Sequence, residues 1–216
     1  SVLERNLGYS FQDKKLLTHA LTHSSYASEH DLAYSENNER LEFIGDAYLD
    51  AIIGNKLYEV MPNQPEGVLS KTRANIVCER SLATIARNIG LGDFLFLGNG
   101  EEMYGGREKD SILADAVEAI IGAIIRESGY DCADRVVLKL FEENILLALQ
   151  GKLYHDYKTA LQEKLQERYK NVRIQYESVS ESGPDHRKVF TVQVKVDDAV
   201  LATGSGHSKK AAEQEA

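Results

Sequence analysis

The chain has 216 residues, enough for one large domain or for a medium-sized domain followed by a small one. Its composition is that of an ordinary globular protein, and the longest apolar run, 119–125, is too short to cross a bilayer. Its only cysteines, Cys78 and Cys132, have neither CxxC spacing nor the pattern of a disulfide framework, and the first residues do not resemble a signal peptide. These features argue against a membrane protein and a disulfide scaffold, and they predict a cytoplasmic location.

The net charge of −9 argues at first against a nucleic-acid partner, but the charge is unevenly distributed. Residues 152–216 contain eleven basic and ten acidic side chains, a net charge of +1, which leaves −10 for the first 151 residues. An acidic body joined to a near-neutral segment indicates two modules with different tasks.

The first 150 residues have the apolar spacing of helices almost throughout and show no strand-like alternation of any length, so we predict an all-α domain over 1–150. Pro65 suits the first turn of a helix, and Asp110 or Ser111 is the expected N-cap of the most apolar one. The expected segments, in chain order, are a helix within 13–25, a polar loop at 25–38, helices at 39–60 and 65–88, a glycine-rich connection at 90–106, and helices at 109–128 and 131–150.

After a short linker at 151–154, the pattern changes to that of a small α+β domain over 155–216. An amphipathic helix is expected first, and two runs with period-two alternation then predict strands around the turn "SGPDH". A third strand and a helix that the end of the sequence cuts short complete an α-β-β-β-α order. The expected ranges are 157–169 for the first helix, 172–181, 188–196 and 199–206 for the strands, and 208–216 for the last helix.

Four carboxylates share one face of the expected helix 39–60. Glu42, Asp46 and Asp50 all lie close to the direction of Glu39, and at 100° per residue the four fall within about 80° of one another. Like charges at this spacing repel, at a cost of a few tenths of a kcal/mol per pair. Another part of the molecule must therefore offset this repulsion.

A second acidic pair, Asp115 and Glu118, lies on one face of the expected helix 109–128, inside the most apolar stretch of the chain. A buried carboxylate is very costly unless it is paired or bound to a metal. The two acidic helices can satisfy each other by facing a shared cation. Clustered carboxylates without His or Cys ligands select hard ions such as Mg²⁺ or Mn²⁺.

These motifs resemble those of the ribonuclease III family. "NERLEFIGD" at 38–46 resembles the family signature, and "ILADAVEAIIGAI" at 112–124 resembles its second acidic motif. "ALTHSSYA" at 20–27 and "PEG" at 65–67 also stand where such a nuclease has them. The resemblance covers about 1–149, and the α-β-β-β-α segment separately resembles a double-stranded-RNA-binding domain.

The resemblance implies an endoribonuclease that hydrolyses double-stranded RNA to 5′-phosphate and 3′-hydroxyl ends. It implies Mg²⁺ as the cofactor, with Mn²⁺ able to substitute, and no organic cofactor. Staggered cuts need two sites across one duplex, so it also implies a homodimer through the nuclease domain. It gives Asp50 no role. The implied roles are catalysis for Asp46 and Glu118, metal binding for Glu42, Asp115 and Glu118, and support of an acidic valley for Glu39 and Glu66.

In the second module, the resemblance implies contacts to the shape of A-form RNA. Lys209 and Lys210 are expected to bind phosphate, Gln162 and Glu163 one minor groove, and His186 the next. The sequence departs from the usual pattern at 213, where a glutamate stands in place of a third lysine, so the grip on phosphate should be modest. The glycines of "GSGHSKK" at 204–210 indicate a tight strand-to-helix turn and not a phosphate loop, which would need a GK[ST] arrangement.

Other functions fit the sequence less well. His19, His23 and the pair His30–Asp31 could suggest an HD-type metal phosphohydrolase, but His30 and Asp31 fall in a polar loop that would hold ligands poorly. No nucleophile elbow or Cys–His motif supports a serine or cysteine hydrolase. The main alternative is a non-catalytic protein that binds double-stranded RNA through a decayed nuclease domain, although decay would typically replace one of the four central carboxylates.

Overall fold

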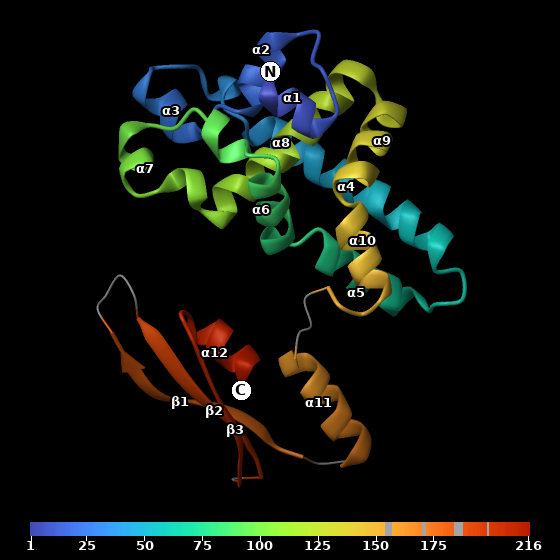
Figure 1. Ribbon diagram of the computed structural model, residues 1–216, viewed down its shortest axis with the longest axis vertical. Helices are drawn as coiled ribbons and strands as arrows, with labels where there is room; N and C mark the ends of the chain where they lie inside the picture. Colours follow the sequence, from blue (N-terminus) through green and yellow to red (C-terminus); the bar gives the residue numbers. More distant parts are fainter. Residues whose placement is uncertain (154–156, 170–171, 184–187, 198) are drawn as a thin grey trace. The chain divides into compact units, whose positions relative to one another are not determined.

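The structure is a computed structural model that describes residues 1–153, 157–169, 172–183, 188–197 and 199–216. The chain divides into two compact units, Ser1–Leu153 and Tyr154–Ala216. The first unit is helical and the second contains a sheet with helices, which confirms the predicted fold classes (Figure 1). None of the helices in the described part of the chain has the length and apolar character that a membrane crossing requires.

The first unit is built from short helices around two long ones. Its elements, in chain order, are α1 (Val2–Leu7), α2 (Lys14–Ala20), α3 (Ser24–Glu29), η1 (Tyr34–Glu36), α4 (Glu39–Val60), α5 (Glu66–Ile76), α6 (Glu79–Asn88), η2 (Leu91–Phe94), α7 (Asn99–Met103), η3 (Gly106–Glu108), α8 (Asp110–Ser128), α9 (Tyr130–Leu140) and α10 (Glu142–Leu149), where η marks a 3-10 turn.

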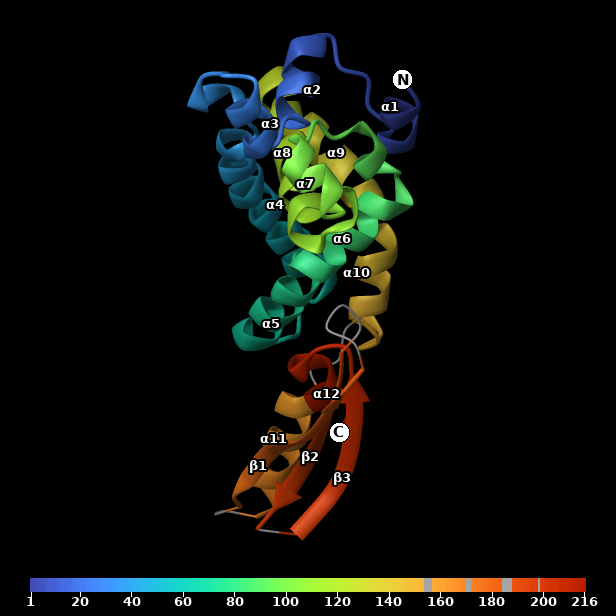
Figure 2. The same cartoon turned by 90° about the vertical axis from the view of Figure 1, so that its left-hand side faces the viewer.

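The helix α8 is the centre of this unit, with α2, α4, α6 and α9 packed around it (Figures 1 and 2). Between Ile112 and Ile125 every residue is buried except two, Asp115 and Glu118. A helix that is apolar on all sides is buried on all sides. The two carboxylates therefore mark the one stripe of this stretch that is not sealed in the core.

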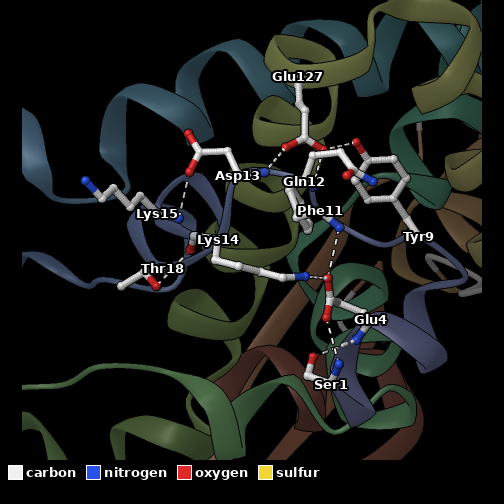
Figure 3. Close-up of polar contacts among 10 residues, drawn as sticks. All are labelled: Ser1, Glu4, Tyr9, Phe11, Gln12, Asp13, Lys14, Lys15, Thr18 and Glu127. Carbon is white, nitrogen blue, oxygen red and sulfur yellow. Dashed lines mark hydrogen bonds and ion pairs between the residues drawn. The ribbon is translucent and has the colours of Figure 1, made fainter.

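Polar contacts fasten the N-terminal segment to the carboxyl end of α8 (Figure 3). The carboxylate of Glu127 accepts hydrogen bonds from the backbone N–H of Asp13 at 2.8 Å and of Gln12 at 3.2 Å, and from the Tyr9 hydroxyl. These contacts satisfy backbone groups just before α2 and fix where that helix begins.

A second anchor in the same segment is Glu4, which is only 5% exposed. The Lys14 ammonium forms an ion pair with its carboxylate and holds its pKa low, at about 2 (Figure 3). The N–H of Phe11 also donates to this carboxylate, at 2.9 Å. Glu4 thus ties α1 to the start of α2.

Three expected boundaries in the first unit were wrong. The helix expected at 65–88 is two helices. The first, α5, ends at Ile76, whose side chain is fully buried, and Cys78 has an extended backbone before α6 begins. The helix expected at 131–150 bends at Phe141, whose side chain is also fully buried. Backbone hydrogen bonds to and from Phe141 run across this bend. No glycine or proline marks either position, so tertiary packing decides both.

The third wrong boundary is the N-cap of α8. Lys109 takes this position, and Asp110 is the first helical residue. The Asp110 carboxylate pairs with Arg87 of α6 at 2.5 Å instead of capping its own helix.

The segments expected to be loops also contain helical structure. The polar loop 25–38 includes η1 and most of α3, and the connection 90–106 includes η2 and α7.

The second unit has the expected α-β-β-β-α order: α11 (Tyr157–Arg168), β1 (Ile174–Ser182), β2 (Val189–Val196), β3 (Ala199–Gly206) and α12 (Lys209–Glu215). The strands form an antiparallel sheet in the order β1-β2-β3, with α12 packed on β2 and β3 and in contact with α11 (Figure 1). Val192 and Val194 of β2 are buried in its core. Gly204 lies within β3 and not in the turn after it, and a β-carbon there would lie 2.1 Å from the backbone of Ala216, so this glycine permits close packing of the chain end on the strand.

Candidate metal centre and RNA-binding residues

Two glycines bring the acidic helices α4 and α8 into direct contact. A β-carbon on Gly45 of α4 would lie 1.8 Å from the carbonyl oxygen of Glu118, and one on Gly122 of α8 would lie 2.1 Å from that of Leu41. Real side chains do not approach backbone this closely, so only glycine fits at both positions. The side chains that flank this crossing are those of the two acidic motifs.

The crossing gathers three of the predicted metal ligands. Glu42, Asp115 and Glu118 each offer one carboxylate oxygen, and these three oxygens all lie within 4.8 Å of one another. All three side chains are half-buried. Carboxylates in such a cluster suit a hard divalent cation, which prefers oxygen ligands.

The electrostatics of the cluster are unfavourable without a cation. Burial raises the pKa of Glu118 to about 8, with further contributions from the charges of Asp46, Glu42, Asp115 and Asp50. A shift of this direction and size is what burial together with several like charges produces. At neutral pH and without a cation, Glu118 therefore favours its protonated form.

The other two carboxyls shift in the same direction. Burial raises the pKa of Glu42, and the charges of Asp115, Glu39 and Asp46 add to this. Burial also raises the pKa of Asp115. A divalent cation would reverse these shifts, because it favours the charged form of all three groups. The three carboxylates therefore fit a metal ion in two ways: their oxygens are ligands that such an ion prefers, and their mutual repulsion is relieved by its positive charge.

Three further carboxylates of α4, those of Glu39, Asp46 and Asp50, act electrostatically on this cluster. Asp46 is exposed beside it, one turn along from Glu42. Glu39 is half-buried at the first position of α4, where its N–H donates to the Asn37 side chain at 3.1 Å. The resemblance assigns Asp50 no role, and its Oδ1 lies 3.6 Å from Nε of Arg73 in α5. Its charge still contributes to the raised pKa of Glu118.

Glu66 lies apart from these residues. It is the first residue of α5, which follows the carboxyl end of α4, whereas Glu42 is close to the amino end. The 22 residues of α4 extend over about 33 Å. The Glu66 carboxylate accepts a hydrogen bond from the Ser70 hydroxyl at 2.6 Å. Its predicted place in the acidic valley stays a prediction.

Two groups that were not predicted from the sequence, His23 and Glu79, act through their charges on Asp115. The imidazole of His23 lowers its pKa against the effect of burial, and the carboxylate of Glu79, at the start of α6, raises it. His23 belongs to the "ALTHSSYA" motif, but the sequence suggested for it only the discarded phosphohydrolase function. Glu79 belongs to no motif, and no signal in the sequence could have identified it.

The predicted RNA contacts are placed unevenly. Lys209 and Lys210 are exposed at the start of α12, which Ser208 caps by accepting the Ala211 N–H at 3.1 Å. Lys209 also lies 3.7 Å from Glu181. Gln162 is exposed on α11. Glu163 belongs to the same helix, but its side chain lies outside the described residues, and so does the whole of His186.

Family models match both units of the chain. A model described as "Ribonuclease-III-like" matches residues 13–145, and one described as "Double-stranded RNA binding motif" matches residues 157–216. The first range contains every carboxylate of the candidate metal centre, and the second contains all the predicted RNA contacts.

Named relatives extend the match to almost the whole chain. The Ribonuclease 3 of Caldanaerobacter subterraneus is 51% identical over 99% of this chain and 93% of its own length. The Ribonuclease 3 of Pelotomaculum thermopropionicum is 45% identical over 100% of this chain and 89% of its own length.

A solved structure supports the assignment of the first unit. It is the nuclease domain of ribonuclease III from Campylobacter jejuni, described as flexible in a region involved in dimer formation. It is 49% identical, with a TM-score of 0.63, and the match covers 68% of this chain and 98% of that domain. The chain belongs to the ribonuclease III family and is a metal-dependent endoribonuclease that acts on double-stranded RNA.

Proposed function

We propose that Glu42, Asp115 and Glu118 bind Mg²⁺, for which Mn²⁺ can substitute, and that Asp46 and Glu118 are the catalytic carboxylates. The observation that carries this proposal is the convergence of three half-buried carboxylates, with oxygens within 4.8 Å of one another, at the crossing of α4 and α8. When bound there, such an ion supplies Lewis-acid activation of water and neutralises the charge that develops on the scissile phosphate.

Each carboxylate around the proposed ion has its own role. Glu42 and Asp115 orient the site from two different helices, and their half-burial limits competition from bulk water. Glu118 completes the ligand set at the point where the two backbones touch. Asp46 is exposed beside the cluster, where it can hold a water or accept its proton. Glu39 adds negative charge at the edge, and we keep Glu66 as a peripheral group of the acidic valley.

We further propose a homodimer through the nuclease unit. The related Campylobacter domain is described as having a region involved in dimer formation. In this chain, Phe43 is 80% exposed and Tyr34 is 73% exposed, one in α4 and one just before it. Large exposed apolar side chains beside a functional site indicate an interface. A second copy on this face would place a second acidic cluster near the first, as cuts in both strands of a duplex require.

In the second unit, we propose that Gln162, Glu163, His186, Lys209 and Lys210 contact RNA by the shape and charge of the A-form duplex. Lys209 and Lys210 supply exposed positive charge, whereas the first 151 residues carry a net charge of −10, so the second unit should contribute much of the affinity. A role in RNA processing in the cytoplasm agrees with the two free cysteines, both half-buried.

Assays of end-labelled duplex RNA and of one of its single strands, with Mg²⁺ and with a chelator, test this function. We expect cleavage of the duplex only, only with Mg²⁺, and with products that ligate as 5′-phosphate and 3′-hydroxyl ends. The alternative of a decayed nuclease domain predicts binding of the duplex without cleavage at any metal concentration. The presence of Glu42, Asp46, Asp115 and Glu118 does not favour that alternative.

A further inference from the structure

Asn38 lies at the start of α4, but its side chain does not cap that helix. The side-chain oxygen of the preceding residue, Asn37, accepts the N–H of Glu39 at 3.1 Å, and the backbone of Asn37 is extended, as is typical of a cap. Asn38 already has helical backbone angles, with φ −77° and ψ −11°, and makes no side-chain capping bond. The amide group of Asn38 is therefore not used to start the helix.

This amide is nevertheless almost enclosed by protein. Asn38 is only 3% exposed, and its side chain makes no hydrogen bond within the described part of the chain. Every fully enclosed side-chain nitrogen or oxygen of the described residues has a partner, so the small exposed part of Asn38 must include its amide. Leaving a buried amide unpaired costs about 1–3 kcal/mol. Such a group in a native protein calls for an explanation, which a bound group can supply.

The backbone fixes Asn38 one turn before Glu42. Its carbonyl accepts the N–H of Glu42 at 2.9 Å, and its own N–H donates to the Thr22 carbonyl at 2.9 Å. Residues four apart share a helix face, with β-carbons about 5–6 Å apart. Helical side chains lean toward the amino end, so the Glu42 side chain leans back over the turn that contains Asn38. The two polar groups are therefore neighbours on the surface of α4.

A second asparagine of α4 shows what this spacing allows. Nδ2 of Asn55 donates to Oε1 of Glu59, four residues later, at 3.2 Å. Both members of that pair are exposed. Asn38 and Glu42 have the same order and spacing, but Asn38 is buried and Glu42 is half-buried in the acidic cluster. The same contact would there hold a carboxylate that faces other carboxylates.

We propose that Asn38 is a positioning residue of the metal centre, whose Nδ2 donates to one oxygen of Glu42 while the other oxygen binds the ion. This inference rests on the proposed metal site. The donor is neutral, so it orients the carboxylate without competing with the charge of the ion. Hydrogen bonds in such sites often tighten only when the site is loaded. Loss of a bond that holds a ligating carboxylate costs about 10–100-fold in metal affinity or activity.

Two matched substitutions in α4 separate this role from a structural one. Asn38→Leu removes the donor at nearly constant size. Because the amide has no protein partner to lose, this change should leave the melting temperature in chelator unchanged or raise it. Asn55→Leu is the control, since it removes the same group at the same spacing from an exposed Glu. Binding of Mn²⁺ alone is followed by the paramagnetic resonance signal of the free ion.

We expect Asn38→Leu to lose about tenfold or more in Mn²⁺ affinity and to melt in chelator at or above the temperature of wild type. Asn55→Leu should bind Mn²⁺ like wild type. In wild-type protein, Mg²⁺ should shift the side-chain amide resonances of Asn38 and slow the exchange of its amide protons with water. The resonances of Asn55 should not respond, and this comparison does not require any variant to fold.

The outcomes that overturn the role of Asn38 differ from those that overturn the metal site. Wild-type Mn²⁺ affinity in Asn38→Leu, with lost affinity in Asp115→Asn, would overturn the role of Asn38 alone. So would a lower melting temperature of Asn38→Leu in chelator with unchanged Mn²⁺ affinity, or Asn38 amide resonances that ignore Mg²⁺. Unchanged affinity in Asp115→Asn would overturn the proposed metal site, and the role of Asn38 with it.

Discussion

The backbone of α4 at Gly45 touches the backbone of α8 at Glu118, with only 1.8 Å between the carbonyl oxygen of Glu118 and the place where a β-carbon on Gly45 would be. The same crossing is closed from the other helix by Gly122 against Leu41. This contact sets the distance between the two acidic motifs, so the geometry of the candidate metal centre depends on residues that carry no functional group.

Replacement of Gly45 by alanine should therefore damage the fold and the site together. The added methyl would force the helices apart, and we expect a loss of about 3 kcal/mol or more in the free energy of unfolding, measured with urea. Gly67→Ala is the control, because Gly67 lies in α5 with no atom within 4 Å of the added carbon. That change should be neutral or stabilising by up to about 1 kcal/mol. Equal effects of the two substitutions would contradict the close packing of α4 on α8.

In the absence of metal, Glu118 should make the protein less stable as the pH rises. Its pKa is about 8 in the folded protein and 4.5 ordinarily, so its contribution is fully present below about pH 4.5 and is lost as the pH rises through about 8. In chelator at pH 8, Glu118→Gln should have a higher melting temperature than wild type and a free energy of unfolding larger by on the order of 2 kcal/mol. At pH 5 the two proteins should melt alike.

Mg²⁺ should remove most of this difference, because an ion that binds only the folded wild type stabilises it. Glu118→Gln should accordingly gain less from Mg²⁺. The control is Glu143→Gln, exposed in the first turn of α10, which should follow wild type in both conditions. If wild type melts at the same temperature in chelator and in excess Mg²⁺, the carboxylates do not share a metal site.

The second unit should determine how cleavage responds to salt. A chain truncated after Gln150 should still cut duplex RNA at low salt and should lose activity steeply as the salt concentration rises, because the contacts of Lys209 and Lys210 are gone. Lys209→Ala with Lys210→Ala should weaken binding of all duplex sequences alike and leave single-turnover cleavage at saturating RNA intact. Lys195→Ala is the control, since Lys195 pairs with Glu177 on the sheet. Unchanged RNA affinity of the truncated chain at physiological salt would show that this unit is not the RNA-binding domain.

The sequence predicted those helices whose apolar residues recur at helical spacing and whose ends carry clear local signals. The acidic helix 39–60 was expected with the bounds that α4 has, because a polar loop precedes it and the prolines of 61–67 follow it. The α-β-β-β-α order followed in the same way from a change of period. What failed were breaks without a local signal, at Cys78 and at Phe141, where buried side chains bend the chain.

For the site, the sequence could indicate which carboxylates share a helix face but not which ones meet across two helices. Glu42, Asp115 and Glu118 meet because Gly45 and Gly122 permit backbone contact, and that is a property of the packed pair. Glu66, grouped with them through a motif, is the first residue of α5, and its place in the acidic valley stays a prediction. The charges of His23 and Glu79 act on Asp115 from other segments of the chain, which a reading along one helix cannot detect.

The central claim is that the carboxylates at the crossing of α4 and α8 perform the chemistry, and single-turnover cleavage of saturating duplex RNA at millimolar Mg²⁺ tests it most directly. Asp46→Asn and Glu118→Gln should bind the duplex like wild type and cleave it about a thousandfold more slowly, since several kcal/mol of transition-state stabilisation are lost. Asp50→Asn, on the same stripe but paired with Arg73, should cleave within about threefold of wild type. Near-wild-type cleavage by either Asp46→Asn or Glu118→Gln would contradict the assignment of the site.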